Sequence, residues 1–284
     1  MEISIAALLR EGAERLRAAG LSDGRAESAL LLGDLLSMDR LRMLAAEDDG
    51  VAAEHATAFR ERIARRAGHE PVAYILGYRD FYNARFRVNP GVLIPRPETE
   101  ALVELALQAR HLPTDARVLD LCCGSGCVGI SLQQARPDWR VTCSDISTAA
   151  LAVARENGDT ILGTDREWPA YIHSDLFAEL DDSRFDAILC NPPYIHPEEA
   201  GDLARDLTFE PDTALYHSDP LAFNERIVFE SAERMDADGL FVLETSPRWT
   251  ARLREVAASV LHDVRVLSDL GGLERIITGR KRAK

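Results

Sequence analysis

The chain has 284 residues, of which 46% are hydrophobic and 28% charged, and its formal net charge at pH 7 is −14. This length favours one large domain or a small and a medium one, and the negative charge argues against a broad surface that binds nucleic-acid phosphates. The N-terminus lacks the basic start of a signal peptide and no apolar run reaches membrane-spanning length, so we expect a cytoplasmic protein with no membrane partner. The five cysteines are expected to be reduced thiols, because a chain of this size does not need disulfides.

Residues 1–76 predict a small helical bundle. The apolar spacing indicates one helix that ends at Gly20, a second that Ser22 caps, and a third over residues 52–67. The expected apolar face of the second helix consists of Ala26, Ala29, Leu30, Leu35 and Leu36. No residue set here suggests catalysis, so this region is interpreted as a module that docks the substrate or as an interdomain module.

Residues 77–95 predict a β-hairpin that links the two halves of the chain. Two short stretches with strand-like patterns flank Asn83 and Ala84, where we expect the turn. The sequence LIPRPETE follows at residues 93–100, where Pro97 suits the first turn of a helix and the acidic residues suit its positive end. This crowding of proline, arginine and glutamate suggests that the segment has a role beyond starting a helix.

Strands and helices alternate from residue 117 onward, which is typical of a doubly wound α/β fold. The expected strands lie near residues 118–121, 141–144, 171–173, 186–190, 240–243, 264–267 and 275–278. The last two enclose Gly271 and Gly272 and are expected to pair antiparallel. A parallel sheet with an antiparallel terminal strand favours the Rossmann-like sheet of class I methyltransferases, which use S-adenosylmethionine (SAM), over a dinucleotide dehydrogenase. This domain is expected to occupy residues 96–284.

A glycine-rich loop at residues 120–126 follows the first of these strands and opens a helix. Glycines let the backbone approach a ligand closely, and the N–H groups at the start of the helix face it. The candidate cofactor-binding residues of the loop are Cys122, Cys123, Gly124, Ser125 and Gly126. Together with Gly129 the two glycines also satisfy the pattern G-x-G-x-x-G, which keeps a nicotinamide or flavin site open.

The next two strands each end near an aspartate. A carboxylate at the position of Asp145 can accept hydrogen bonds from both ribose hydroxyls of an adenosine. Residues 174–177 follow the third strand, where side chains such as Leu176 can flank an adenine and Asp175 can accept from its exocyclic amine. The alternative for each aspartate is the N-cap of a following helix. Because these loops share one edge of the sheet with residues 120–126, we expect a single adenosine site there.

The fourth strand stops at Asn191, because the two prolines that follow cannot continue a hydrogen-bonded ladder. The turn places an Asn amide, a proline carbonyl and a Tyr ring at the carboxyl end of a strand, which is the edge where open α/β sheets bind ligands. The alternative is a strand terminator with no chemical role. The candidate catalytic and substrate-binding residues are Asn191, Pro192, Pro193 and Tyr194, and Asn191 is also expected to border the cofactor.

The cysteines do not predict a metal site. Cys122, Cys123 and Cys127 contain no C-x-x-C pair, and the scattered histidines form no H-E-x-x-H motif. Cys143 and Cys190 fall in predicted strands. We therefore expect small thiols packed in the core.

Four of these segments together resemble the HemK-type protein-glutamine N5-methyltransferases. They are residues 93–100, 120–126, 174–177 and 191–194, and residues 70–77, 209–211 and 273–280 resemble further segments of that family. The resemblance implies a SAM-dependent enzyme with a helical N-terminal domain, a hairpin linker and a Rossmann-like domain. Many family members have Gly-Thr-Gly-Thr-Gly where this chain has Cys-Cys-Gly-Ser-Gly, a departure that does not discriminate between the subfamilies.

The PRPETE sequence resembles the members that methylate the glutamine of the Gly-Gly-Gln motif in class I peptide chain release factors. By the same resemblance, the Asn191 side-chain oxygen and the Pro192 carbonyl accept the two N–H bonds of that glutamine. Pro193 supplies rigidity, and Tyr194 packs over the planar amide. No direct contact with nucleic acid is implied.

Four alternatives remain open. A glutamine methyltransferase of a ribosomal protein shares most of the motifs, although such members depart from PRPETE after the Pro-Arg. A nucleic-acid methyltransferase acting on N6 of adenine or N2 of guanine faces the same problem of two N–H donors. An NAD-type oxidoreductase fits only the glycine spacing and Asp145. A catalytically silent SAM-binding scaffold is the fourth alternative.

Overall fold

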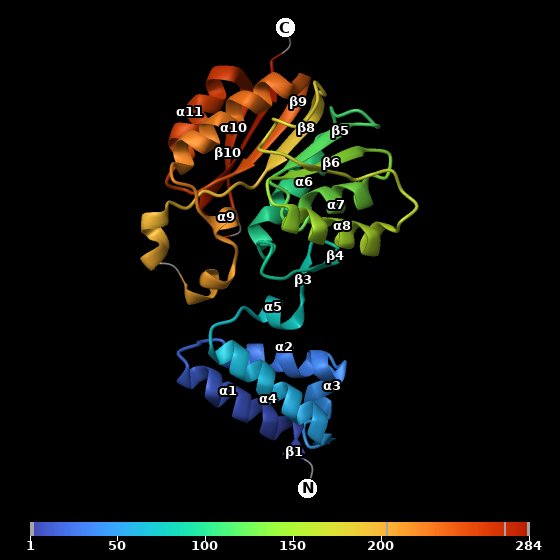
Figure 1. Ribbon diagram of the computed structural model, residues 1–284, viewed down its shortest axis with the longest axis vertical. Helices are drawn as coiled ribbons and strands as arrows, with labels where there is room; N and C mark the ends of the chain where they lie inside the picture. The colour runs from blue at the N-terminus through green and yellow to red at the C-terminus, as the bar shows by residue number, and fades with distance from the viewer. Residues whose placement is uncertain (1–2, 203, 270, 283–284) are drawn as a thin grey trace. The chain divides into compact units, whose positions relative to one another are not determined.

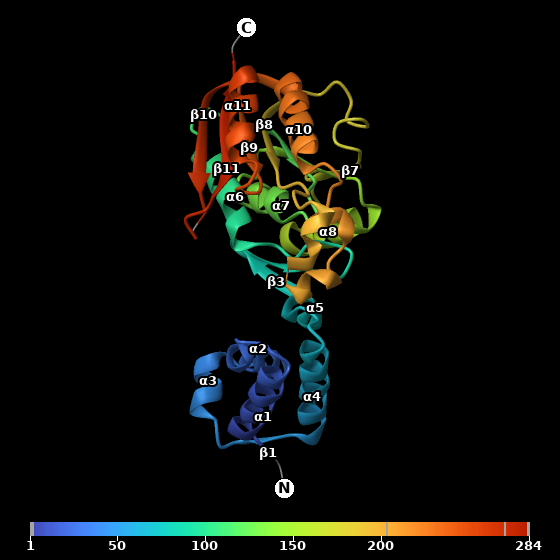
Figure 2. The same ribbon diagram turned by 90° about the vertical axis from the view of Figure 1, so that its left-hand side faces the viewer.

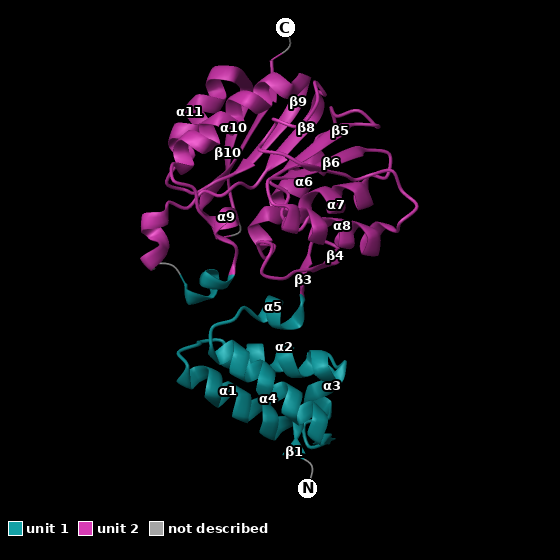
Figure 3. Ribbon diagram, viewed as in Figure 1, with its two compact units in different colours: residues 1–77, 204–209 teal, residues 78–203, 210–284 magenta. Residues whose placement is uncertain are grey.

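The computed structural model describes residues 3–202, 204–269 and 271–282, and the chain forms two compact units. Figure 3 colours the first unit teal and the second magenta. The first consists of residues 1–77 and 204–209, and the second of residues 78–203 and 210–284. Within the described ranges, no helix combines the length and the apolar character that a membrane span needs.

The first unit is a helical bundle (Figures 1 and 2). Its elements are β1 (Ile3–Ser4), α1 (Ile5–Ala18), α2 (Gly24–Leu36), α3 (Arg40–Ala45), β2 (Gly50–Val51), α4 (Ala53–Ala67), α5 (Val72–Leu76) and the 3₁₀ helix η3 (Arg205–Phe209). The strands β1 and β2 pair antiparallel. The centre of the bundle is filled by Leu8, Leu16, Leu32, Phe59 and Ile63, all at most 1% exposed. The sequence did not predict α3, α5 or the small sheet.

Two predictions about α2 are wrong. The helix begins at Gly24 with Asp23 at its N-cap position, so Ser22 does not cap it. Its buried side chains include Leu31 and Leu32, whereas Leu30 is 58% exposed. The reason is that apolar residues are spread around α2, so their spacing does not define one face, and packing against α1 and α4 selects the face instead.

The segment of residues 204–209 joins the first unit through a buried cation. The guanidinium of Arg66, whose side chain is 5% exposed, donates to both carboxylate oxygens of Glu27 at 2.9 Å. It also pairs with Asp206 at 2.9 Å. Because a buried charge is stable only when it is paired, this contact fixes η3 within the bundle.

The second unit is a doubly wound α/β domain, which confirms the predicted fold class. Its elements are β3 (Tyr78–Phe81), β4 (Ala84–Arg87), η1 (Pro97–Thr99), α6 (Glu100–Gln108), β5 (Arg117–Leu121), α7 (Cys127–Ala135), β6 (Arg140–Asp145), α8 (Thr148–Leu162), β7 (Ala170–His173), β8 (Phe185–Cys190), η2 (Pro197–Asp202), α9 (Asp212–Leu215), α10 (Pro220–Arg234), β9 (Met235–Glu244), α11 (Thr250–Val260), β10 (Leu261–Ser268) and β11 (Glu274–Lys281). Tyr82 and Asn83 form the hairpin turn, one residue earlier than predicted, with Tyr82 in the left-handed region at φ 53°.

The central sheet has the strand order β10-β11-β9-β8-β5-β6-β7. The strands from β9 to β7 are parallel, and β11 is antiparallel to both β9 and β10, as the sequence predicts. The chain builds outward from β5 to β7 and then returns to place β8 on the other side of β5. Loops at such a reversal diverge and leave a crevice at the carboxyl ends of the strands.

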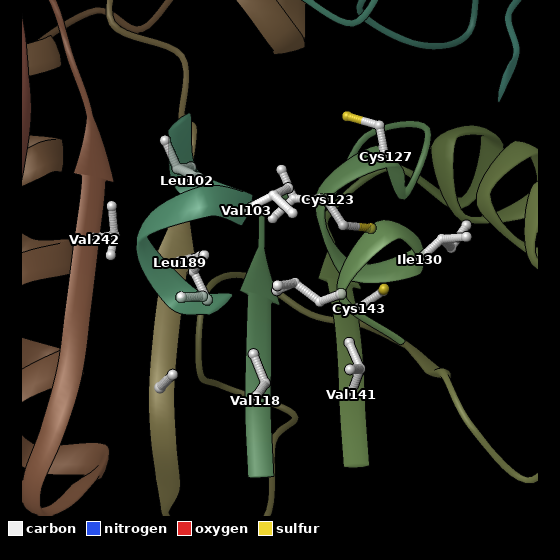
Figure 4. Close-up of a cluster of buried hydrophobic side chains, with 14 of the residues drawn as sticks. Leu102, Val103, Val118, Cys123, Cys127, Ile130, Val141, Cys143, Leu189 and Val242 are labelled. Carbon is white, nitrogen blue, oxygen red and sulfur yellow. The ribbon is translucent and has the colours of Figure 1, made fainter. Parts of the chain in front are cut away.

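Helices cover both faces of this sheet, with α6, α7 and α8 on one side and α10 and α11 on the other (Figure 1). Figure 4 shows the first of the two cores, in which Leu102 and Val103 of α6 and Ile130 of α7 meet the strands. The strand residues that it labels include Val118, Val141, Cys143, Leu189 and Val242. Burial on both faces explains why these strands are nearly continuous apolar runs in the sequence.

Candidate active site

A pocket of about 370 Å³ lies at the carboxyl ends of β5 to β8, within the second unit. It is lined by eight of the predicted site residues: Cys122, Cys123, Gly124, Ser125, Asp145, Leu176, Asn191 and Pro193. Three further predicted residues, Gly126, Pro192 and Tyr194, are not among the lining residues. The structure therefore gathers loops from four strands around one cavity, as their shared sheet edge predicts.

The loop after β5 is bent by residues in the left-handed region, with φ 60° at Cys122, 54° at Gly124 and 76° at Gly126. A Cβ on Gly124 would meet no atom within 4 Å, so the backbone there is open to the pocket. A Cβ on Gly126 would lie 2.8 Å from the Ile130 side chain. The first glycine thus permits close approach of a ligand, while the second permits packing of α7.

Asp145 connects two of the loops that form the pocket. Its Oδ2 accepts from the Gly124 N–H at 2.9 Å and its Oδ1 from the Ser147 N–H at 2.8 Å. Burial raises its pKa, and these N–H bonds oppose that rise. Ser147 rather than Asp145 is the N-cap of α8, so the capping alternative for Asp145 is wrong. Each carboxylate oxygen keeps a second lone pair for a ligand.

The loop after β7 supplies an apolar wall. Leu176 is 4% exposed and adopts φ 50°, an uncommon conformation for a residue with a side chain, and such residues cluster at functional sites. Asp175 also lines the pocket, and its half-exposed carboxylate lies 3.6 Å from the Arg226 guanidinium. A turn follows Asp175, so it caps no helix.

Asn191 belongs to a hydrogen-bond chain that the sequence did not predict. Its Nδ2 donates to Thr99 Oγ1 at 3.0 Å, and Thr99 Oγ1 donates to Glu244 Oε2 at 2.7 Å. The Tyr194 hydroxyl donates to Glu244 Oε1 at 3.4 Å. Thr99 lies in η1, and Glu244 is the last residue of β9 and is 1% exposed.

Two acceptor atoms of this turn are available to a ligand. No donor to Asn191 Oδ1 or to the Pro192 carbonyl occurs among the residues that the structure describes. Burial raises the pKa of the Tyr194 hydroxyl, so this group stays a neutral phenol at physiological pH. The signal that the sequence analysis missed is Glu244, an acidic residue at the end of a buried strand like Asp145.

Sequence analysis assigned no role to Asp120, which lines the pocket, or to Glu210, which contacts the lining residue Arg96. Asp120, 3% exposed, accepts from the Gly129 N–H at 2.8 Å, and burial raises its pKa to about 7. Glu210, 5% exposed, accepts from Arg96 at 2.6 Å and from the Ile94 N–H at 3.0 Å. The two hydrogen bonds of Glu210 fix the LIPRPETE segment to the chain that follows η3.

The five cysteines are free thiols, and three of them, Cys122, Cys123 and Cys127, line the pocket. Cys123, Cys127, Cys143 and Cys190 are buried, and Cys122 is partly exposed. Burial raises the pKa of the Cys127 thiol, and a hydrogen bond to Cys143 raises that of Cys123. In the described chain, no three His, Cys, Asp or Glu side chains are grouped so as to hold a metal ion.

Comparisons with known proteins identify the family. A model described as the PrmC N-terminal domain matches residues 7–77, and one described as the Methyltransferase small domain matches residues 98–218. The chain is 37% identical to a Release factor glutamine methyltransferase of Leptospira interrogans, over 96% of this chain and 97% of that one. It is 42% identical to one of Neisseria gonorrhoeae, over 76% and 78% of the respective chains.

A solved structure supports the fold. A methyltransferase from Pyrococcus furiosus, 14% identical, superposes with a TM-score of 0.53 over 78% of this chain and 99% of that one. Identity this low supports the fold only, whereas the two sequence relatives cover most or nearly all of the chain. The chain therefore belongs to the family of release factor glutamine methyltransferases.

Proposed function

We propose that this protein transfers a methyl group from SAM to the side-chain nitrogen of the glutamine in the Gly-Gly-Gln motif of class I peptide chain release factors. The observation that carries the proposal is the Asn191 carboxamide at the pocket, with its nitrogen engaged by Thr99 and its oxygen free. The names of the relatives support release factors as the substrate class.

The pocket has the chemical character that SAM requires. Asp145 can accept from ribose hydroxyls, and Leu176 offers an apolar surface to the adenine. The carboxyl groups of Asp120 and Asp175 line the pocket, and in their ionised form they complement the sulfonium and ammonium cations of SAM. When bound, SAM supplies an electrophilic methyl group.

The amide nitrogen of glutamine is a weak nucleophile, because its lone pair is delocalised into the carbonyl. Asn191 Oδ1 and the Pro192 carbonyl can accept its two N–H bonds and so direct the lone pair along a fixed line. Orientation of this kind can contribute up to ~7–11 kcal/mol to lowering the barrier. Tyr194 is proposed to pack over the planar amide, with its hydroxyl anchored on Glu244.

The transfer needs no base beforehand. The new N–C bond forms as the C–S bond breaks, the sulfur keeps the electron pair, and the nitrogen then loses one proton to solvent. The residues of the turn therefore orient and do not deprotonate. Pro193 stiffens the turn, since its ring fixes the backbone.

The domain roles are also proposals. Residues 1–76 dock the release factor, residues 77–95 form the linker hairpin, and residues 96–284 bind SAM and carry the chemistry. The exposed apolar side chains of the helical unit, Leu30, Leu41 and Leu44, offer contact area to a protein substrate. A release factor is a translation protein, which supports a cytoplasmic location.

The decisive experiment uses the purified protein, labelled SAM, a native release factor and a variant of that factor with Glu in place of the Gly-Gly-Gln glutamine. We expect label on the native factor at that glutamine, mapped by mass spectrometry, and none on the variant. A parallel incubation with ribosomes and DNA covers the alternative substrates. Equal labelling of both factors, or labelling confined to a ribosomal protein or DNA, would overturn the proposal.

Asn191→Ala tests the role of the turn. Losing one acceptor of the target amide should lower the turnover number ~10²-fold or more. SAM affinity, measured by calorimetry, should fall by a smaller factor. A mutant that binds SAM normally and turns over at the native rate would remove Asn191 from the reaction.

A further inference from the structure

The orientation of one carboxamide decides whether the turn can act as proposed. An Asn side chain carries an acceptor oxygen and a donor NH₂ that exchange places on a half-turn about χ2. With the oxygen toward the pocket, Asn191 accepts a substrate N–H. With the nitrogen there, it presents two donors to a group that is itself a donor.

The Thr99 hydroxyl selects between these orientations. A hydroxyl has one proton, and that of Thr99 is given to Glu244 Oε2 at 2.7 Å. Only lone pairs of Thr99 Oγ1 then face Asn191, so the NH₂ group must lie on that side, which agrees with the 3.0 Å contact to Nδ2.

Glu244 in turn fixes the direction of the Thr99 proton. An ionised carboxylate can only accept, and this one is 1% exposed, so water does not compete for it. Burial raises the Glu244 pKa and the Glu98 carboxylate adds to that rise, while the Thr99 hydrogen bond, the Arg275 cation and the Tyr194 hydrogen bond oppose it. The two oxygens of Glu244 receive the Thr99 hydroxyl at 2.7 Å and the Tyr194 hydroxyl at 3.4 Å, so the contacts of this carboxylate are those of an acceptor.

We propose that Glu244 and Thr99 are positioning residues, which hold the Asn191 carboxamide with its oxygen toward the target amide. The proposal rests on the proposed function of the same pocket and adds to it how the acceptor is oriented. None of the three residues is near another in sequence: Thr99 is 92 positions from Asn191 and 145 from Glu244. The pairing of β8 with β9, and the packing of α6, which directly follows η1, against β9, bring the three residues together.

We call this arrangement, in which Glu244 orients Thr99 and Thr99 orients Asn191, the relay. Kinetics of full-length variants test it. Thr99→Val keeps the shape and deletes the hydroxyl, and Glu244→Met keeps the chain length and deletes the acceptor. Each should lower the turnover number roughly 10- to 100-fold at saturating SAM, while SAM affinity stays within about threefold. Thr99→Ser keeps the hydroxyl and should restore turnover to within about fivefold of the native rate.

The decisive comparison uses a double mutant. If Thr99 acts only through Asn191, Thr99→Val should have almost no further effect on turnover in the Asn191→Ala background, because interacting residues are non-additive. An equal loss in both backgrounds, or a Thr99→Ser variant as slow as Thr99→Val, would overturn the relay. Thermal unfolding shows whether the Glu244 variant folds. If it does not fold, the Thr99 variants alone decide the outcome.

A spectroscopic measurement does not depend on turnover. In the native protein, the two Asn191 Nδ2 protons should show a nuclear Overhauser contact to the Thr99 methyl group, and Glu244→Met should weaken it. Native protein without this contact would overturn the relay even if the release factor is methylated. The contact without any methylation of a release factor would instead count against the proposed function.

Discussion

At the scale of single residues, burial and hydrogen bonds give neighbouring carboxylates different properties. Within the described part of the chain, Asp145 accepts two backbone N–H bonds, whereas Asp120 accepts one, from Gly129, and is less exposed to water. Burial accordingly raises the pKa of Asp120 to about 7. Two carboxylates at one pocket can thus respond to a cationic ligand in different ways.

Asp145→Ala should weaken SAM binding by roughly tenfold or more, because losing a charged acceptor costs ~1.5–3 kcal/mol. The measurement is calorimetry on the folded variant, with Asp115→Ala, an exposed carboxylate before β5, as the matched control. Unchanged affinity in Asp145→Ala would exclude this residue from the ribose site.

Asp120 should release a proton when SAM binds. In the free protein its pKa of about 7 leaves it partly protonated at pH 6 to 7, and a cation in the pocket favours the ionised form. Release should therefore be largest near pH 6 to 7 and vanish above about pH 8, where Asp120 is already ionised.

Calorimetry in two buffers of different ionisation enthalpy measures this release. Asp120→Asn should abolish most of it, and S-adenosylhomocysteine, which lacks the sulfonium charge, should release less than SAM. Equal release by the native protein and Asp120→Asn would contradict the assignment.

At the scale of elements, the loop before α7 contains two glycines with separate tasks. Both have positive φ, so an alanine at either position adds strain of ~1–2 kcal/mol. Gly126→Ala also forces a contact at 2.8 Å with Ile130 and should lower the unfolding temperature more. Gly124→Ala should mainly weaken SAM binding, because its methyl group points into open space at the pocket.

Thermal unfolding and calorimetry on the two variants separate these effects. The pair serves as its own control, since the substitution is the same and the positions are two residues apart. A Gly124 variant that binds SAM normally, or a Gly126 variant as stable as the native protein, would show that the division of tasks is wrong.

The inner parallel strands β5, β8 and β9 could be predicted because most of their residues are buried and apolar, whereas the edge strand β7 is only partly buried. The face of α2 could not, since its apolar residues surround the helix and only its neighbours decide which side is buried. The same distinction between sequence pattern and packing applies to the site. Loops at strand ends were predictable from sequence order, whereas the contact of Asn191 with Thr99 depends on packing across the sheet.

At the scale of the whole molecule, the ion pairs of the first unit differ in burial and therefore in expected worth. Asp206→Asn removes one of the two carboxylates described at the buried Arg66, which keeps Glu27 and the Glu70 carbonyl, and should lower the free energy of unfolding by ~1–2 kcal/mol. Glu11→Gln breaks an exposed pair with Arg60 and should lower the free energy of unfolding by less, because solvent screens exposed ion pairs.

Denaturant unfolding of both full-length variants checks this difference. SAM affinity should not change in either, because every residue that lines the pocket belongs to the second unit. Equal stabilities of the two variants would mean that Asp206 contributes no more than a surface charge.

The chain crosses between the two units three times, after residues 77, 203 and 209. The helical unit is therefore not encoded by one continuous segment, because residues 204–209 belong to it. A chimera that takes its first 77 residues from a relative replaces position 66 but keeps Asp206, the partner of Arg66 in this chain. A domain exchange that ignores residues 204–209 therefore mismatches the bundle with part of its own structure.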